Sequence, residues 1–103
     1  MRRIFYNCSS LSSINLLNFK TNNVYDMRSM FSKSSLSSLD LSTFDTKNIE
    51  NMSWMFSNCN SLISLHLSNF SNNNVTYMIE MFSDCSSLTS LNLSNFNSNK
   101  ILK

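Results

Sequence analysis

The 103-residue sequence contains no glycine and no proline. These two residues normally supply the special backbone angles of tight turns, so their absence excludes the usual turn chemistry of a small globular domain. Asparagine tolerates the left-handed region of backbone space better than most other non-glycine residues. We therefore expect asparagine to occupy the left-handed turn positions.

Charged residues and long apolar runs are also scarce. Charged residues make up 14% of the chain and the formal net charge is +2, which is too small to indicate a nucleic-acid partner. No apolar run approaches the roughly 18 residues that a membrane-spanning helix needs. Residues 4–6 are too short an apolar stretch for a signal peptide. We expect no membrane insertion, signal peptide or anchor within these residues.

One motif occurs four times along the chain. The copies begin at Leu11, Leu36, Leu62 and Leu88 and read LSSINLLNF, LSSLDLSTF, LISLHLSNF and LTSLNLSNF. A spacing of 25 or 26 residues with constant landmarks indicates a repeat array. The pattern runs up to both ends, so we interpret residues 1–103 as a single array and as a fragment of a longer one.

Each repeat has two halves that differ in their apolar spacing. The first half follows L-x-x-L-x-L, in which Leu65 and Leu67 alternate with polar residues as on a short strand. In the second half, apolar residues follow at steps of 3, 3, 1 and 3 and cover roughly a 120° arc of a helix. In the third repeat these residues are Val75, Met78, Met81, Phe82 and Cys85.

Asparagine precedes each predicted helix. Asn23, Asn48 and Asn74 stand just before the first apolar helical residue, where an N-cap is expected. One strand–helix unit cannot bury its own apolar face, but stacked units form a continuous core. The sequence therefore predicts an α/β solenoid. This solenoid would be a leucine-rich-repeat-like stack of four short strand–helix rungs, with a parallel sheet on its concave face.

The L-x-x-L-x-L element is that of leucine-rich repeats, with one departure. The usual asparagine, three residues after the last leucine, is replaced by Phe19, Phe44, Phe70 and Phe96. The combination LSNF…NV..M..MF..C.SL resembles the BspA-like leucine-rich-repeat family of bacterial surface proteins, which also occurs in mycoplasmas and some parasitic protists. The resemblance covers essentially the whole chain. It implies display at the cell surface, adhesion, and binding of host or neighbouring-cell proteins.

The stretch MSWMFSNC, Met52–Cys59, combines ligand types that copper(I) favours. The same pattern recurs with Ile4 in a methionine place, and the second repeat offers Lys33 or Ser34 in the cysteine place. A metal site would not survive these changes, whereas a core position accepts them. The sequence therefore predicts that this stretch packs in the core, and it predicts no metal and no cofactor.

The three cysteines allow one borderline disulfide. Cys59 and Cys85 would lie on neighbouring rungs, but packed helices are about 8–10 Å apart, which is long for a disulfide. An odd number of cysteines without a C-x-x-C motif argues against a disulfide framework and against zinc. Buried thiols are the favoured interpretation.

Residues between the inward leucines would point outward and form a candidate binding face. Asp40 beside His66, with serines nearby, invites a Ser-His-Asp catalytic reading. Serine is abundant throughout the chain, however, and His66 has no evident pocket or oxyanion donors. We predict that the protein is not an enzyme and that Asp40 and His66 form an exposed pair. The candidate face comprises Ser13, Asn15, Ser38, Asp40, Ser42, Ser64, His66, Ser68, Ser90, Asn92 and Ser94.

Trp54 occupies the place that Ser29 and Glu80 hold in the neighbouring repeats, outside the buried arc. We expect it to be partly exposed. It could be a binding anchor, but the favoured interpretation is that it leans on the neighbouring rung.

The predicted function is that of a non-enzymatic binding module, part of a cell-surface adhesin, that binds a protein through its Ser/Asn face. The alternative is a structural spacer or assembly array that carries another domain. Neither end of the array shows the polar caps that normally close such a stack. We therefore expect the isolated chain to associate end to end, or to be stable only within a longer array.

Overall fold

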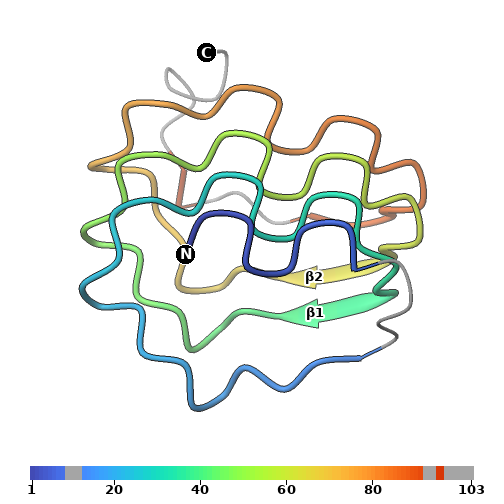
Figure 1. Ribbon diagram of the computed structural model, residues 1–103, viewed down its shortest axis with the longest axis horizontal. Coiled ribbons are helices and arrows are strands. Elements are labelled where there is room, and N and C mark those ends of the chain that lie inside the picture. The colour runs from blue at the N-terminus through green and yellow to red at the C-terminus, as the bar shows by residue number, and fades with distance from the viewer. Residues whose placement is uncertain (9–12, 92–94, 97–103) are drawn as a thin grey trace.

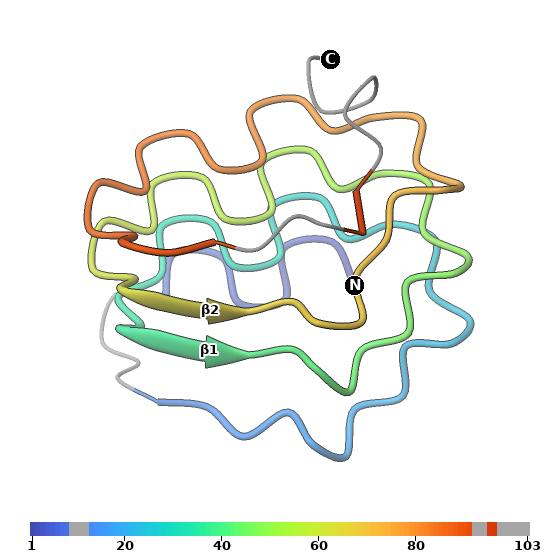
Figure 2. The same cartoon turned by 180° about the vertical axis from the view of Figure 1, so that it is seen from behind.

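In the computed structural model, which describes residues 1–8, 13–91 and 95–96, the chain winds through successive circuits stacked side by side (Figures 1 and 2). One such circuit is here called a coil. Each coil has an extended segment on one side and a wavy segment on the other. The extended segments include strands β1 (Ser38–Asp40) and β2 (Ser64–His66), which pair in parallel with Leu39 opposite Leu65.

The predicted α/β solenoid of four strand–helix rungs is wrong. The described part of the chain contains no helix, and β1 and β2 are its two strands. Residues 13–16 of the first repeat form no strand, and the fourth repeat contributes a single bridge between Ser64 and Ser90. The described residues therefore include no helix that could span a membrane.

The segments predicted to be helices form a wall of tight turns, here called the turn wall (residues 1–8, 27–34, 52–59 and 78–85). Each segment has positive φ, between 49° and 61°, at two positions four residues apart. Every residue of an α-helix needs negative φ, so these positions exclude a helix. The positive-φ pairs are Arg3 and Asn7, Ser29 and Lys33, Trp54 and Asn58, and Glu80 and Asp84. Among these described positions asparagine holds two of eight, so the expectation that asparagine would occupy them is wrong.

Backbone hydrogen bonds in the turn wall alternate between two kinds of partner. The N–H of Met30 donates to the carbonyl oxygen of Met27 within the same coil, at 3.2 Å. The N–H of the next residue, Phe31, donates to the carbonyl oxygen of Met55 in the following coil, at 2.9 Å. Alternate donors therefore join one coil to the next, whereas a helix would use its donors within itself.

The apolar spacing fits this wall as well as it fits a helix. Positive φ recurs every four residues, so the backbone of the wall repeats every four residues rather than every 3.6. Over a stretch as short as Met52–Cys59, both periods place the same residues on one side. No glycine marks the positive-φ positions, which is why the sequence pattern indicated a helix.

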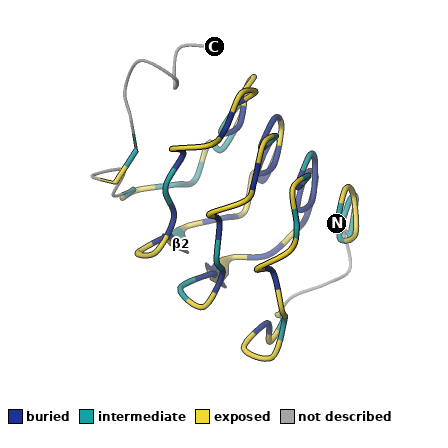
Figure 3. Cartoon of the chain, turned by 90° about the vertical axis from the view of Figure 1, so that its left-hand side faces the viewer, coloured by how far each residue is buried: buried dark blue, intermediate teal, exposed yellow. Residues whose placement is uncertain are grey.

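The prediction that Met52–Cys59 packs in the core is confirmed. Met52, Met55 and Phe56 have no exposed surface, and Cys59 is 1% exposed. Figure 3 shows the buried residues lining the inside of the coils and the exposed residues on the outside. The apolar face that resembled a metal-binding box is thus the inner side of the turn wall.

Phenylalanine rings stack in a column along the inside of the turn wall. The column consists of Phe5, Phe31, Phe56 and Phe82, one from each coil, with ring centroids 5.4, 5.8 and 5.5 Å apart in that order and planes within 9° of parallel. Equivalent rings stack because equivalent residues of successive coils lie directly over one another. Residues 1–8 therefore belong to the array as its first wall segment.

Threonine side chains join the coils between the strands and the turn wall. Thr21 Oγ1 accepts a hydrogen bond from the N–H of Asp45 (2.8 Å) and donates to the carbonyl oxygen of Asp45 (3.1 Å). Thr46 makes the same two bonds to Ser71, at 3.1 and 3.2 Å. Thr21 is 3% exposed and Thr46 is 4% exposed, and these bonds satisfy their buried hydroxyls.

Of the three asparagines predicted to cap helices, Asn23, Asn48 and Asn74, the last two instead bridge the coils. The side-chain amide of Asn48 donates to the carbonyl oxygen of Asn22 in the preceding coil, at 2.6 Å, and Asn74 donates in the same way to Lys47. The predicted N-cap role is therefore wrong, since there are no helices to cap.

Candidate functional site

Strands β1 and β2 present one row of polar side chains to solvent. Leu39 and Leu65 point inward and are 3% and 7% exposed, so their neighbours along each strand point outward. The outward residues and those that flank them are here called the strand face. Of the predicted site residues, Ser13, Asn15, Ser38, Asp40, His66, Ser68 and Ser90 are exposed and Ser42 and Ser64 are half-buried. Asn92 and Ser94 lie outside the described residues.

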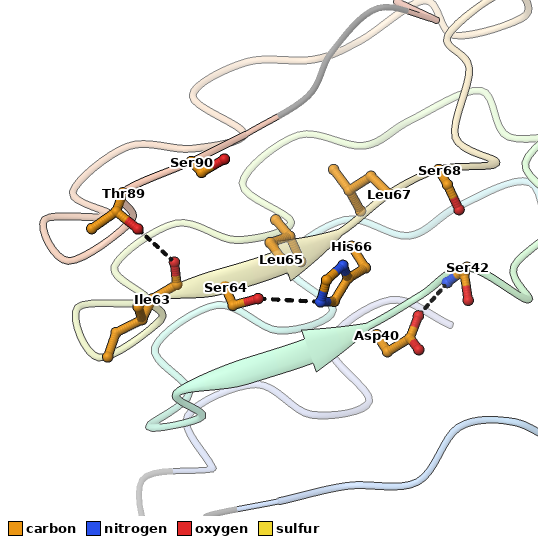
Figure 4. Close-up of a pocket in the computed structure, with 10 residues that line it drawn as sticks. All are labelled: Asp40, Ser42, Ile63, Ser64, Leu65, His66, Leu67, Ser68, Thr89 and Ser90. Atoms are coloured by element: carbon orange, nitrogen blue, oxygen red, sulfur yellow. Dashed lines mark hydrogen bonds between the residues drawn. The ribbon is translucent and has the colours of Figure 1, made fainter.

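Asp40 and His66 lie opposite each other in the parallel register, but each bonds a residue of its own coil (Figure 4). Asp40 Oδ1 accepts a hydrogen bond from the N–H of Ser42 at 3.0 Å, and Ser64 Oγ lies 3.2 Å from His66 Nε2. The ion pairs within the described ranges are Arg28–Asp26 and Lys47–Asp45, so Asp40 and His66 are neighbours without an ion pair.

The pKa of the Asp40 carboxyl is lowered below its ordinary value. The main cause is hydrogen bonding to Ser42, and the nearby charge of His66 adds to the effect. Asp40 is therefore a carboxylate at neutral pH. It offers a fixed negative charge and free acceptor positions on the surface of the strand face.

The strand face is hollowed into an open depression of about 490 Å³. Its polar lining comes from the serines, Asp40 and His66 of the predicted face. Leu65 of β2 and Leu67, which directly follows β2, also line it. Two residues that the sequence analysis did not include, Ile63 and Thr89, complete it. Ile63 is 52% exposed and stands directly before β2. An apolar residue at this otherwise polar position is a feature of the sequence that could have indicated its part in the site.

The arrangement suits hydrogen bonding rather than a catalytic relay. In a Ser-His-Asp triad the carboxylate orients the imidazole that activates the serine. Here the Ser64 hydroxyl is within reach of His66, but Asp40 is bonded to Ser42. The strand face therefore offers hydroxyl groups, one imidazole and one carboxylate as separate hydrogen-bonding groups beside an exposed apolar side chain.

A second depression lies on the outer side of the turn wall, and the sequence analysis did not predict it. It is lined by Arg2, Arg3, Arg28, Ser29 and Trp54. Trp54 is 38% exposed, as predicted, and its Nε1 donates to Glu80 Oε2 in the next coil at 3.3 Å. The favoured interpretation, that Trp54 leans on its neighbour, is confirmed. The small side chain of Ser29 leaves the hollow between Arg3 and Trp54.

Arg28 beside this depression is held by Asp26. The guanidinium and the carboxylate form a two-pronged ion pair, with a closest distance of 2.7 Å. Burial acts to raise the pKa of the Asp26 carboxyl, but its hydrogen bonds and charge interaction with Arg28 outweigh burial and lower it. Arg28 is therefore fixed in place, while Arg3 lies over the ring of Tyr6 at 4.7 Å.

One protein-family model matches residues 1–103, that is, the whole chain. The family is described as "Mycoplasma protein of unknown function, DUF285". The chain belongs to this family. No curated protein and no solved structure matches it significantly.

The cysteines of this DUF285 member are free thiols. Cys59 Sγ donates to the carbonyl oxygen of Phe31 at 3.1 Å, and Cys85 Sγ donates to that of Phe56 at 3.0 Å. Burial raises the pKa of both thiols, to about 11 for Cys85. These thiol–carbonyl bonds link each coil to the preceding one. Ser34 holds the place of Cys59 in the preceding coil, and its Oγ lies 3.6 Å from Cys59 Sγ. Within the described ranges, no three His, Cys, Asp or Glu side chains gather as metal ligands.

Proposed function

We propose that this DUF285 member is a non-enzymatic binding module that takes a protein partner on its strand face. The observation that carries the proposal is the row of exposed hydrogen-bonding side chains on β1 and β2. These side chains are fixed by strands whose alternate residues, Leu39 and Leu65, are buried in the core. Rigid presentation lowers the entropy lost on binding.

The chemistry of the strand face favours a protein over a small molecule. The depression is open and its walls are serine hydroxyls, Asp40 and His66, which match the backbone amides and polar side chains of a protein surface. Ile63, which is 52% exposed at the edge of the depression, supplies an apolar contact of the kind found inside protein interfaces. Small-molecule sites are usually more enclosed and more apolar than this.

We further propose that the repeats are of the BspA-like leucine-rich type and that the protein acts in adhesion at the cell surface. The support for this finer assignment is the repeated LSNF…NV..M..MF..C.SL pattern. Family membership is compatible with it at the level of a Mycoplasma protein. A reading frame that joins these repeats to a signal peptide and a surface anchor would support adhesion. A fused catalytic domain would favour the alternative of a structural spacer.

The test is saturable binding of the fluorescently labelled protein to cultured epithelial cells, measured by flow cytometry before and after the cells are treated with trypsin. We expect binding that trypsin abolishes, because the partner is a protein. The double variant Ser68→Arg/Ser90→Arg places two long side chains at the edge of the strand face and should weaken binding about tenfold or more.

The matched control is Asn23→Arg/Thr76→Arg, which adds the same charge at two exposed positions outside the strand face. It should bind as the unmodified protein does. Absence of trypsin-sensitive binding, or equal binding by both double variants, would overturn the proposal and leave the spacer function as the better account.

A further inference from the structure

The turn wall has two edges that complement each other in their backbone groups. Between neighbouring coils, alternate N–H groups of one segment donate to carbonyl groups of the next. Phe5 donates to Met30 at 2.9 Å, and Phe56 donates to Met81 at 3.0 Å. For these backbone N–H to carbonyl bonds, the direction is the same throughout the wall, always from the earlier coil to the later one. A stack built in this way ends in unused donors on one side and unused acceptors on the other.

The unused groups can be named. In the last wall segment, the N–H groups of Glu80, Phe82 and Asp84 occupy the donating positions, and they have no hydrogen-bond partner within the described part of the chain. In the first wall segment, the carbonyl groups of Arg2 and Ile4 occupy the accepting positions and accept no bond from any described residue. The third acceptor, the carbonyl of Tyr6, is contacted by the Cys8 thiol at 3.9 Å.

The phenylalanine column is open at the same two edges. Phe31 and Phe56 lie between rings on both sides and have no exposed surface. Phe5 and Phe82 each stack on one ring of this column and are only partly buried. Each end of the column therefore offers an aromatic surface of the kind that its neighbours bury.

The charges at the two edges have opposite sign. Arg3, Ser29, Trp54 and Glu80 form one column along the wall, since each is the first positive-φ residue of its segment. Arg3, Trp54 and Glu80 are exposed, and the small Ser29 is buried. This column begins with a guanidinium at the first coil and ends with a carboxylate at the last. Arg2 adds positive charge at the first edge, and Asp84 adds negative charge at the other.

We infer that the first coil of one copy of this chain docks on the last coil of another, continuing the turn wall. In this interface the N–H groups of Glu80, Phe82 and Asp84 donate to the second copy's carbonyl groups of Arg2, Ile4 and Tyr6. Phe5 of the second copy stacks on Phe82, and its Arg3 pairs with Glu80. The two surfaces are different, so the contact is head-to-tail and can extend into linear chains. The inference does not depend on the proposed function, because it involves the turn wall and not the strand face.

The test is a charge swap followed by sedimentation velocity on the 103-residue chain across a concentration series. The unmodified protein should form dimers and longer species, and high salt should weaken them because it screens the Arg3–Glu80 pair. Arg3→Glu and Glu80→Lys should each weaken association about tenfold, since each variant places like charges at the contact. An equimolar mixture of the two variants should restore association, because every junction between unlike variants joins opposite charges.

Two matched controls carry the same charge changes on interior coils. Lys47→Glu and Glu50→Lys alter exposed residues away from both edges, and they should associate as the unmodified protein does. All four variants should retain cooperative thermal unfolding, since every substituted side chain is exposed. The inference is refuted if the unmodified chain stays monomeric at all concentrations. It is equally refuted if the single variants associate normally or if mixing them restores nothing, because either result would show that residues 3 and 80 do not meet at the contact.

Discussion

Replacing Lys33 by glycine tests the turn wall directly, because a helix and a left-handed turn respond to glycine in opposite ways. Lys33 has φ of 61° and its N–H donates to the carbonyl oxygen of Ser57 at 2.9 Å, a bond that glycine retains. Lys20 is the matched position. It is also an exposed lysine, but its φ is not positive and it belongs to no wall segment.

The expected magnitude follows from three contributions. Removing a non-glycine residue from the left-handed region gains roughly 1–2 kcal/mol of unfolding free energy. The greater freedom of glycine in the unfolded chain costs roughly 0.5–1 kcal/mol. The ammonium of Lys33 lies 5.6 Å from the ring centre of Tyr6, and losing this exposed contact costs about 0.5 kcal/mol. Lys33→Gly should therefore change stability by between about −0.5 and +1 kcal/mol.

A comparison with valine makes the experiment sharper. A β-branched side chain fits poorly at positive φ, so valine should carry the upper end of the left-handed penalty, roughly 2 kcal/mol. The freedom of glycine in the unfolded chain offsets roughly 0.5–1 kcal/mol of this difference. Lys33→Val should therefore be less stable than Lys33→Gly by about 1–1.5 kcal/mol. At Lys20 the order should reverse, with Lys20→Gly less stable than Lys20→Val by about 0.5–1 kcal/mol.

Urea titration followed by tryptophan fluorescence gives the unfolding free energies of these four variants. Thermal melts should also separate the two Lys33 variants by several degrees, since 1 kcal/mol corresponds to about 4–8 °C in a domain of this size. If glycine ranks below valine at both lysines, residue 33 does not have positive φ and the turn wall is misassigned.

Two further predictions concern the core and the thiols. Phe56→Ala should lower the unfolding free energy by about 3–5 kcal/mol. Leu65→Asp should prevent folding because it buries a charge. Met55→Leu should lower the unfolding free energy by less than about 1.5 kcal/mol. The control is Tyr25→Ala, at a side chain that is 65% exposed. It should change the unfolding free energy by no more than about 0.5 kcal/mol. An equal loss of stability for Tyr25→Ala and Phe56→Ala would contradict the core assignment. The raised pKa of Cys85, about 11 against an ordinary value of 9.0, predicts that its alkylation by iodoacetamide keeps accelerating above pH 9 until about pH 11. Because the unfolded thiol ionises first, the linked stabilisation is complete below pH 9 and is lost as the pH rises towards 11. A Cys85 labelling rate that levels off near pH 9, measured by peptide mass spectrometry, would contradict this.

The sequence predicted which residues are buried better than it predicted the backbone that buries them. Met52, Met55 and Phe56 were assigned to the core from their spacing, and that spacing is the same in a helix and in a wall of turns. What separates the two is the sign of φ at residues such as Trp54 and Glu80. Neither residue type signals positive φ. The backbone accepts it there because bonds to the neighbouring coils hold it in place, and such long-range support is not visible in one repeat.

The strand face was partly predictable for a related reason. Alternation in L-x-x-L-x-L placed Asp40 and His66 outward on adjacent strands, where the structure has them. Their bonds to Ser42 and Ser64 depend on side-chain geometry within each coil, which spacing does not specify. The depression beside Trp54 was missed because it depends on the small size of Ser29 between two larger residues of neighbouring coils.

The one-residue difference between repeats shows where this array can change length. From Phe31 to the paired residue Leu39 is eight residues, whereas from Phe56 to its partner Leu65 is nine. The positive-φ positions keep their spacing and the strand register is intact, so the corner between turn wall and strand absorbs the difference. That corner is therefore the place for an engineered insertion, such as an epitope tag after Asn60. The same insertion inside a wall segment would shift the donors, the rings and the left-handed positions of that coil out of line with both neighbours.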